Sequence, residues 1–192
     1  RIRSDGLDLL PLGKASASLL RRARYGGIEA LSEASLLESL EEWAAPHLVR
    51  RLDQVNTGAL HQALLDRLGW DGKQALDRLA PQEFRSPAGT THAIDYDDPG
   101  GPSIEIRVQA LFGLDRHPGF GQPSQPLLLK LTSPGGKPIQ TTRDLPGFWR
   151  GSWRDVVKEM KGRYPRHRWP DQPWAEDPSL KTKNAFEAQR RT

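Results

Sequence analysis

The chain has 192 residues, of which 36% are hydrophobic and 27% are charged, with a net charge of +4 and no cysteine. This size suits one domain, or one domain with a helical extension, and such a composition allows a soluble protein to bury a core. The lack of cysteine excludes disulfides, thiolate zinc sites and a cysteine nucleophile, and it is compatible with a cytoplasmic location.

No apolar stretch approaches the roughly 18–20 residues needed to cross a bilayer, and no signal-peptide core is present, so we expect no membrane partner. The chain opens on Arg1, and its only methionine is Met160. We therefore expect it to be part of a longer protein.

Apolar residues recur at helical spacing through residues 1–80. Ser35 and Glu38 have the spacing of a capping box, which predicts the start of one helix. Another helix is predicted to begin near Thr57 and to stop at Gly69, with a shorter helix behind it. Residues 1–80 therefore form a predicted helical segment.

The hydrophobic period changes after this segment to the alternation expected of strands. Residues 92–96 and 103–112 each alternate, and Gln109 falls on the polar face of the second strand. Residues 127–131 predict a third strand, from which the turn at 133–138 leads into a fourth to give a hairpin. We expect a sheet of three to five antiparallel strands, which either stays open or curls into a small barrel.

A helix is predicted to close this second part of the chain. Asp144 has the position to cap a short turn, and Ser152 and Asp155 have the spacing to start the closing helix. The predicted fold class is thus α+β: a helical N-terminal part, then a small antiparallel sheet closed by a C-terminal helix. We expect its domain over residues 81–178 and a flexible polar tail over 179–192.

Enzyme signatures are missing from the sequence. The pair Gly13-Lys14 lacks the earlier glycine of a Walker A loop, because Asp8 stands there, and lacks the following Ser or Thr, because Ala15 stands there. The five histidines show no metal-binding spacing, and there is no GxSxG elbow. We expect this chain to be no enzyme, with no catalytic residue, cofactor or metal of its own. The aspartates at 95, 97 and 98 favour a solvated loop over a cation site.

The segment 143–170 carries the strongest functional signal. It has eight basic residues against three acidic ones, a net charge of +5 within 28 residues, and it includes three tryptophans and a tyrosine. Lysine and arginine neutralise phosphates, and aromatic rings stack on bases, so this pattern favours a nucleic-acid strand. The predicted contacts are Arg150, Arg154, Arg163, Arg166, Arg168, Tyr164 and Trp169. His167, close to three of these arginines, is expected to prefer its neutral form near pH 7.

The segment has a second interpretation, in which the rings are core anchors and the arginines pair with nearby acids. Acidic residues are plentiful around it, at Asp144, Asp155, Asp171, Glu176 and Asp177. In that case the chain is a structural or protein-interaction module that docks on a partner without touching nucleic acid.

A family resemblance is carried by long stretches of the chain. Residues 131–173, LTSPGGKPIQTTRDLPGFWRGSWRDVVKEMKGRYPRHRWPDQP, resemble the C-terminal signature of the bacterial HrpB family of ATP-dependent DEAH/RHA-type helicases. LEEWAAPHL at 40–48, residues 63–96 and VQALFG at 108–113 resemble it too.

The resemblance implies that this chain follows two RecA-like motor domains, a winged helix and a helical bundle in the parent protein. ATP and Mg²⁺ would then bind in the motor, and the family's catalytic motifs lie outside this stretch. The implied partners are single-stranded RNA or DNA and the motor domains of the same parent chain. The implied role is that of a helicase accessory domain, which includes residues 81–178.

Overall fold

The computed structural model describes residues 6–48 and 54–191. Arg1, on which we based the expectation of a longer protein, lies outside these ranges. The chain divides into two compact units. Unit 1 comprises Arg1–Pro81 and Phe120–Ser124, and unit 2 comprises Gln82–Gly119 and Gln125–Thr192. Within the described ranges, no helix is long and apolar enough to cross a membrane.

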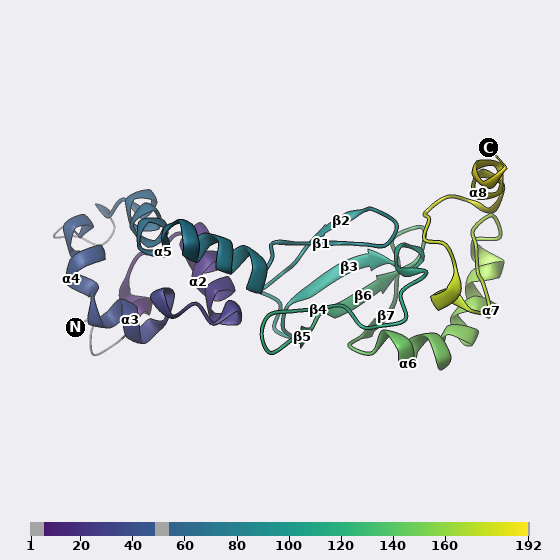
Figure 1. The fold of residues 1–192 in the computed structure, drawn as a ribbon, viewed down its shortest axis with the longest axis horizontal. Helices are drawn as coiled ribbons and strands as arrows, with labels where there is room; N and C mark the ends of the chain where they lie inside the picture. Colours follow the sequence, from purple (N-terminus) through teal and green to yellow (C-terminus); the bar gives the residue numbers. More distant parts are fainter. Residues whose placement is uncertain (1–5, 49–53, 192) are drawn as a thin grey trace. The chain divides into compact units, whose positions relative to one another are not determined.

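Unit 1 is helical (Figure 1). Its elements are η1 (Leu7–Leu9), α2 (Lys14–Gly26), η2 (Glu29–Leu31), α3 (Glu33–Glu38), α4 (Leu40–Trp43), η3 (Ala45–His47) and α5 (Thr57–Leu79). Leucines of α2 and α5 fill its core, and Arg22 links the two helices. Its guanidinium donates to the Ala80 carbonyl and pairs with Asp77 at 2.5 Å.

Two helix boundaries in unit 1 test the sequence predictions. The helix expected to start at Ser35 starts at Glu33 instead, because the hydroxyl of Ser32 accepts from the Ser35 amide at 3.2 Å and so caps it. The predicted stop at Gly69 is confirmed as a kink, where the glycine has φ +65° and divides α5 into two helical parts.

Unit 2 contains short sheets, and α6, α7 and α8 follow the last of them in the chain (Figure 1). Strands β1 (Glu83–Arg85) and β2 (Thr91–Ala93) pair antiparallel. The strands β3 (Ser103–Arg107), β6 (Leu128–Thr132) and β7 (Pro138–Thr142) form one sheet in the order β3-β6-β7. A separate pair joins β4 (Gly119–Phe120) and β5 (Gln125–Pro126).

The predicted hairpin is confirmed by the antiparallel pairing of β6 and β7. The expectation of a wholly antiparallel sheet is wrong, because β3 and β6 run parallel. The 20 residues between these strands provide a crossover long enough to return the chain to the same end of the sheet. The sheets of the described part stay separate and do not close into a barrel.

The strand predicted over 103–112 is shorter than expected. It ends at Arg107, and residues Val108–Leu111 form the 3-10 turn η5, in which all four side chains are buried. Gln109 is 3% exposed instead of facing solvent. The chain leaves the strand conformation after Arg107, and the turn η5 carries Gln109 into the interior instead of leaving it on the polar face of a strand.

Three further helices complete unit 2, namely α6 (Leu145–Arg150), α7 (Trp153–Arg163) and α8 (Lys183–Arg190), with the 3-10 turn η6 (Pro173–Ala175) between the last two. The Asp144 carboxylate caps α6 by accepting from the Gly147 amide at 3.0 Å, as predicted. Helix α7 begins directly after Ser152, also as predicted. Helix α8 lies within the segment that the sequence analysis treats as a polar tail. Helices and small sheets together confirm the α+β class.

Candidate nucleic-acid interface

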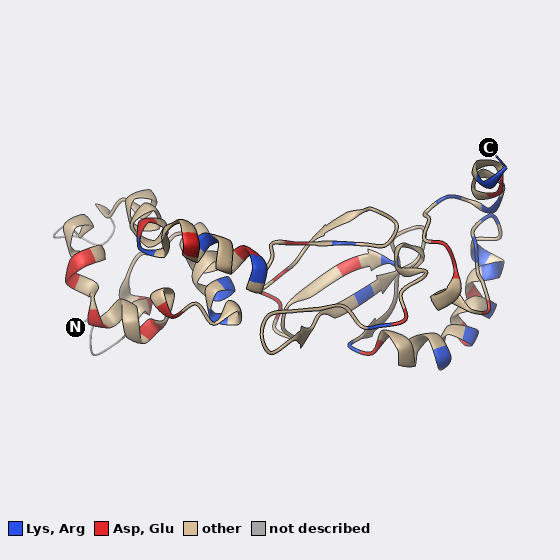
Figure 2. Ribbon diagram, viewed as in Figure 1, with Lys and Arg blue, Asp and Glu red and all other residues tan. Residues whose placement is uncertain are grey.

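Helix α7 presents three different faces because its residue types repeat at helical spacing: a buried face, a basic face and a face that lines a second cavity described below. Trp153, Val157 and Met160 are buried and face the core. Arg154, Lys158 and Lys161 are exposed at positions i, i+4 and i+7, which places them in one row along the helix. Figure 2 shows that Lys and Arg recur along α7. We call this row the basic stripe.

A groove lies beside the basic stripe, between α7 and residues 171–174. Its volume is about 540 Å³. Its lining residues are Trp153, Arg154, Val157, Lys158, Lys161, Asp171, Gln172 and Trp174. The stripe therefore faces a half-buried indole and an amide across a cavity, which combines phosphate-binding cations with an aromatic ring.

The cations of the stripe are weakly engaged by protein groups. Among the described residues, Arg154 and Lys161 form no ion pair, and Lys158 has one partner, Asp155, at 3.4 Å. Both members of that pair are at least 80% exposed. Exposed pairs of this kind contribute little to stability, so the three cations are available to an anion.

Arg150, a predicted contact, is fixed at the edge of the groove. Its guanidinium donates two hydrogen bonds to the Asp115 carboxylate, at 2.7 and 2.9 Å, and it lies 4.5 Å from the centre of the Trp174 ring. Hydrogen bonding to Arg150 lowers the pKa of Asp115, and the same contact raises the pKa of Arg150. Arg150 therefore positions Trp174, and one face of that indole is already occupied.

Three predicted contacts lie beyond the stripe. Arg163 is exposed and pairs with Glu159 at 3.3 Å, whereas Arg166 is exposed without an ion pair among the described residues. The half-buried Tyr164 shares a hydrogen bond of 3.2 Å with the Ser133 hydroxyl. Arg163 and Tyr164 line a second cavity, on the other side of α7 from the stripe.

Arg168 and Trp169 lie in the interior. Arg168 is 8% exposed, pairs with Glu176 at 2.5 Å and donates to the Asp177 carbonyl at 2.9 Å. Trp169 is 4% exposed, and its Nε1 donates to the Tyr164 carbonyl at 3.0 Å. In this structure neither side chain is exposed to a ligand.

His167 shows the predicted preference for the neutral form. Burial is the larger cause of its lowered pKa, and the positive charge of Arg107 is the second. The three neighbouring arginines expected to cause the effect are not its source, because the cation that acts is Arg107, at the end of β3.

The acidic loop at 95–98 has a structural role. The Asp98 carboxylate pairs with Lys130 and accepts from Ser103 Oγ at 2.7 Å and from the Gly100 amide at 2.8 Å. The hydrogen bond from Lys130 is the largest cause of the lowered pKa of Asp98. Across residues 6–48 and 54–191, no cluster of three or more His, Asp or Glu is arranged to hold a metal ion.

Lys158, Lys161 and Trp174 line the groove but are absent from the residues predicted as contacts. The spacing of Arg154, Lys158 and Lys161 in the sequence was sufficient to identify the two lysines, once a helix was predicted there. Trp174 could not be found this way, because only tertiary packing brings residues 171–174 beside α7.

Comparison with known proteins gives the chain its family. Residues 43–173 match the family model described as ATP-dependent helicase C-terminal, HrpB_C. The chain is 42% identical over 156 residues to the ATP-dependent RNA helicase HrpB of Escherichia coli (strain K12), covering 80% of this chain and 19% of that protein.

Two solved structures are similar to the chain. A crystal structure of the E. coli DExH-box NTPase HrpB has a TM-score of 0.73 and 38% identity, covering 93% of this chain and 23% of that one. A crystal structure of the E. coli DEAH/RHA helicase HrpB has a TM-score of 0.62 and 36% identity, with 88% and 22% covered. The chain spans about a fifth of the length of these relatives, 19% to 23%. The resemblance found in the sequence is thus confirmed, and the chain belongs to the HrpB_C family of ATP-dependent helicase C-terminal regions.

Proposed function

We propose that this chain is a non-catalytic accessory domain of an ATP-dependent DEAH-type RNA helicase and that it contacts a single nucleic-acid strand through the groove beside α7. The observation that carries the proposal is the row formed by Arg154, Lys158 and Lys161 opposite Trp174. The relative's name, ATP-dependent RNA helicase, supports RNA as the substrate. A cytoplasmic location is part of the proposal. ATP and Mg²⁺ belong to the motor of the parent protein, and the motor domains are this chain's partners within it.

A row of cations suits a polyanionic strand better than a single anion. Arg154 and Lys161 are seven residues apart, which corresponds to about 10 Å along a helix that rises 1.5 Å per residue. Successive phosphates would lie along this row, and the free face of Trp174 would offer a base a stacking surface.

The proposed contact set differs in part from the predicted one. Arg154 is central to it, and Lys158 and Lys161 join it. Arg150 acts through Trp174. Arg163 and Tyr164 lie on the other side of α7, and Arg166 lines neither cavity, so these three are not part of the set. Arg168 and Trp169 are left out because their side chains are buried.

Specific observations favour a second candidate function, a structural or protein-docking module without nucleic-acid contact. Arg150, Arg163 and Arg168 each pair with a carboxylate, and the rings of Trp149, Trp153 and Trp169 are buried. These are the features expected if the segment serves packing. The exposed, weakly paired stripe is the reason to prefer the strand.

The test is fluorescence anisotropy of the full chain with a labelled single-stranded RNA of about 12 nucleotides, titrated between about 50 and 200 mM salt. Three phosphate contacts give a slope of about −2 in log affinity against log salt, so the affinity falls about fifteenfold over this range. Replacing Arg154, Lys158 and Lys161 together by glutamine is expected to weaken binding at least tenfold at the lower salt concentration.

The matched control replaces three exposed cations that do not line the groove, Lys73, Arg85 and Arg116, by glutamine. It removes the same charge and is expected to keep most of the affinity. Absence of binding at 50 mM salt, or equal loss in both triple variants, contradicts the proposal. Either result leaves the docking function as the better explanation.

A further inference from the structure

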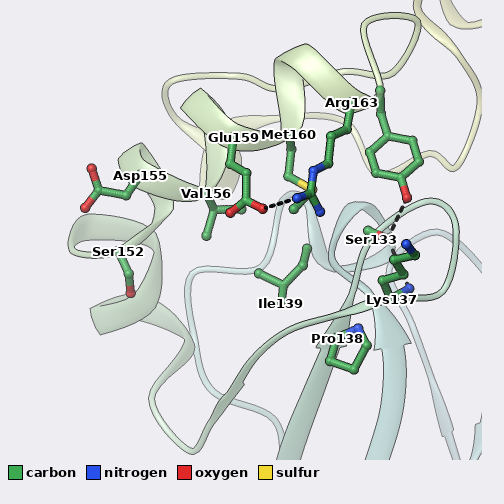
Figure 3. A pocket seen from close by; sticks show the side chains of 11 residues that line it. Ser133, Lys137, Pro138, Ile139, Ser152, Asp155, Val156, Glu159, Met160 and Arg163 are labelled. Carbon is green, nitrogen blue, oxygen red and sulfur yellow. Dashed lines mark hydrogen bonds and ion pairs between the residues drawn. The ribbon is translucent and has the colours of Figure 1, made fainter.

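A second cavity lies on the opposite side of α7 from the basic stripe, between that helix and the β6–β7 hairpin (Figure 3). Its volume is about 210 Å³. Its lining residues are Ser133, Lys137, Pro138, Ile139, Ser152, Asp155, Val156, Glu159, Met160, Arg163 and Tyr164. We call it the hairpin pocket. The function proposed above does not use it.

Hydrogen-bond donors gather at one end of the hairpin pocket. Lys137 is exposed and has no ion pair among the described residues. Arg163 has only the single contact of 3.3 Å with Glu159, in which both side chains are more than half exposed. In Figure 3 the Lys137 side chain lies beside Ser133 at the hairpin turn, and the Arg163 guanidinium lies over the pocket, turned toward Glu159. Lys137 and the exposed, weakly paired Arg163 are therefore the two cations of the pocket that can bind an anionic group.

The hydroxyl pair of Ser133 and Tyr164 adds a further donor. The Ser133 hydroxyl oxygen accepts from the Lys137 amide at 3.1 Å and shares one hydrogen bond of 3.2 Å with Tyr164. Two hydroxyl groups have two hydrogens, and one bond between them uses one, so one O–H remains to donate. Position 135 must be glycine for this arrangement, since a Cβ there would lie 2.6 Å from the Tyr164 hydroxyl.

The rest of the pocket suits the base of a nucleotide. Ile139, Val156 and Met160 supply an apolar floor, on which a planar ring can pack. The carboxylates of Asp155 and Glu159 also line the pocket, Glu159 beside Arg163, and can accept from amino groups. An inorganic anion would use the donors and leave the floor unfilled, whereas a purely apolar ligand would leave the donors unused.

We propose that the hairpin pocket binds one nucleotide, with its phosphate between Lys137, Arg163 and Tyr164 and its base on the apolar floor. The ligand class is a nucleoside monophosphate, supplied either free or as one nucleotide of a strand. The site is separate from the groove, because α7 lies between them and the two cavities share no lining residue.

The experiment is an amide chemical-shift titration of the full chain with AMP, alongside adenosine, inorganic phosphate and a 5′-phosphorylated tetranucleotide. AMP is expected to shift amides of residues 133–139 and 159–164 and to bind at least tenfold more tightly than adenosine or phosphate alone. A tetranucleotide that binds tighter than AMP at the same amides identifies the strand as the source. AMP binding at least as tight identifies the free nucleotide.

Variants separate this pocket from the groove. Tyr164→Phe keeps the ring but removes the hydroxyl, and is expected to weaken AMP binding about tenfold, the effect of losing one hydrogen bond to a charged group. Lys137→Gln, at an exposed position that leaves the fold intact, is expected to weaken it about fivefold. The glutamine triple variant of the stripe should bind AMP normally, so failure of the groove proposal leaves this result unaffected. The proposal is overturned if AMP shifts no amides of the hairpin turn. It is also overturned if both pocket variants respond to AMP as the unaltered chain does, or if phosphate alone produces the same shifts.

Discussion

The indole rings of Trp149 and Trp153 meet edge to face, with 5.2 Å between their centroids and 85° between their planes. Trp153 also contacts the rings of Phe112, Phe148 and Trp169. Its Nε1 donates to the Pro170 carbonyl at 2.8 Å. One side chain thus joins the residue that follows η5, α6, α7 and the segment that follows α7, so the Trp153 face of the helix packs into the core of unit 2.

We expect Trp153→Phe to lower the free energy of unfolding by about 2 kcal/mol. The smaller ring leaves a cavity, and the carbonyl of the half-buried Pro170 loses its donor. Urea unfolding followed by circular dichroism measures the change. The same substitution at Trp70, which is 72% exposed, is the control and should stay within about 0.5 kcal/mol. Equal losses in both variants would show that Trp153 is not a core anchor.

Arg168 should not be replaceable by lysine. Its guanidinium lies 3.6 Å from the centre of the Phe186 ring while bonded to Glu176 and to the Asp177 carbonyl. Lysine cannot stack as a plane and donate to both partners at once. Arg168→Lys is expected to cost about 2 kcal/mol in urea unfolding. Arg166→Lys, on an exposed side chain two residues away, should change stability by less than about 0.5 kcal/mol. If Arg168→Lys kept full stability, the positive charge at this position would stabilise the fold without the planar guanidinium.

His117 should make unit 2 less stable in mild acid. Its Nδ1 accepts from the Leu145 amide at 3.0 Å, so the proton lies on Nε2, which donates to the Leu127 carbonyl at 2.7 Å. Burial lowers the pKa of this imidazole below its ordinary value of 6.5. As the pH falls through that value, the unfolded chain binds a proton that the folded chain excludes, and the free energy of unfolding decreases.

The measurement is urea unfolding at intervals between about pH 7 and pH 5. In His117→Asn, an amide oxygen can replace Nδ1 as the acceptor without titrating, so the dependence on pH should be shallower. His167 contributes in the same direction, because its pKa is also lowered, and a variant with both histidines replaced should be shallower still. A slope that is unchanged in both variants would exclude the histidines as its source.

Replacement by alanine should lower the stability of the protein at Gly69 and raise it at Gly162. Neither position has a heavy atom within 4 Å of an added Cβ, so only backbone conformation differs. Gly69 has φ +65°, where alanine is strained, and Gly69→Ala should cost about 1 kcal/mol. Gly162 lies in α7 without a positive φ, and Gly162→Ala should stabilise by about 0.5–1 kcal/mol. Thermal unfolding of both variants gives the comparison, and a shift of the same sign in both would contradict it.

Local signals in the sequence predicted the local parts of the fold. The turn at 133–138 lies between two strand-like runs, and the hairpin follows from those residues alone. The kink at Gly69 and the cap at Asp144 are equally local. The parallel pairing of β3 with β6 is not a local feature, because a crossover of 20 residues separates the two strands.

The candidate site was predictable in the same limited sense. The charge of the segment singled out the part of the chain that contains α7, and Arg154 lies on the exposed face of that helix. Sequence could not separate Arg166 from Arg168, two residues on, because Phe186 and Glu176 bury the second from positions later in the chain. The rings of Trp149, Trp153 and Trp169 belong to the core for the same reason.

The parallel pairing of β3 and β6 also has a consequence for biosynthesis. A ribosome delivers β3 first, and 20 further residues must emerge before its partner β6 becomes available. During that interval Ile104 and Ile106, which are buried in the finished sheet, face solvent on an unpaired strand. The helices of unit 1 need only nearby residues and can form before then. We expect the nascent chain to be most prone to aggregation, and most dependent on chaperones, between the synthesis of β3 and that of β6.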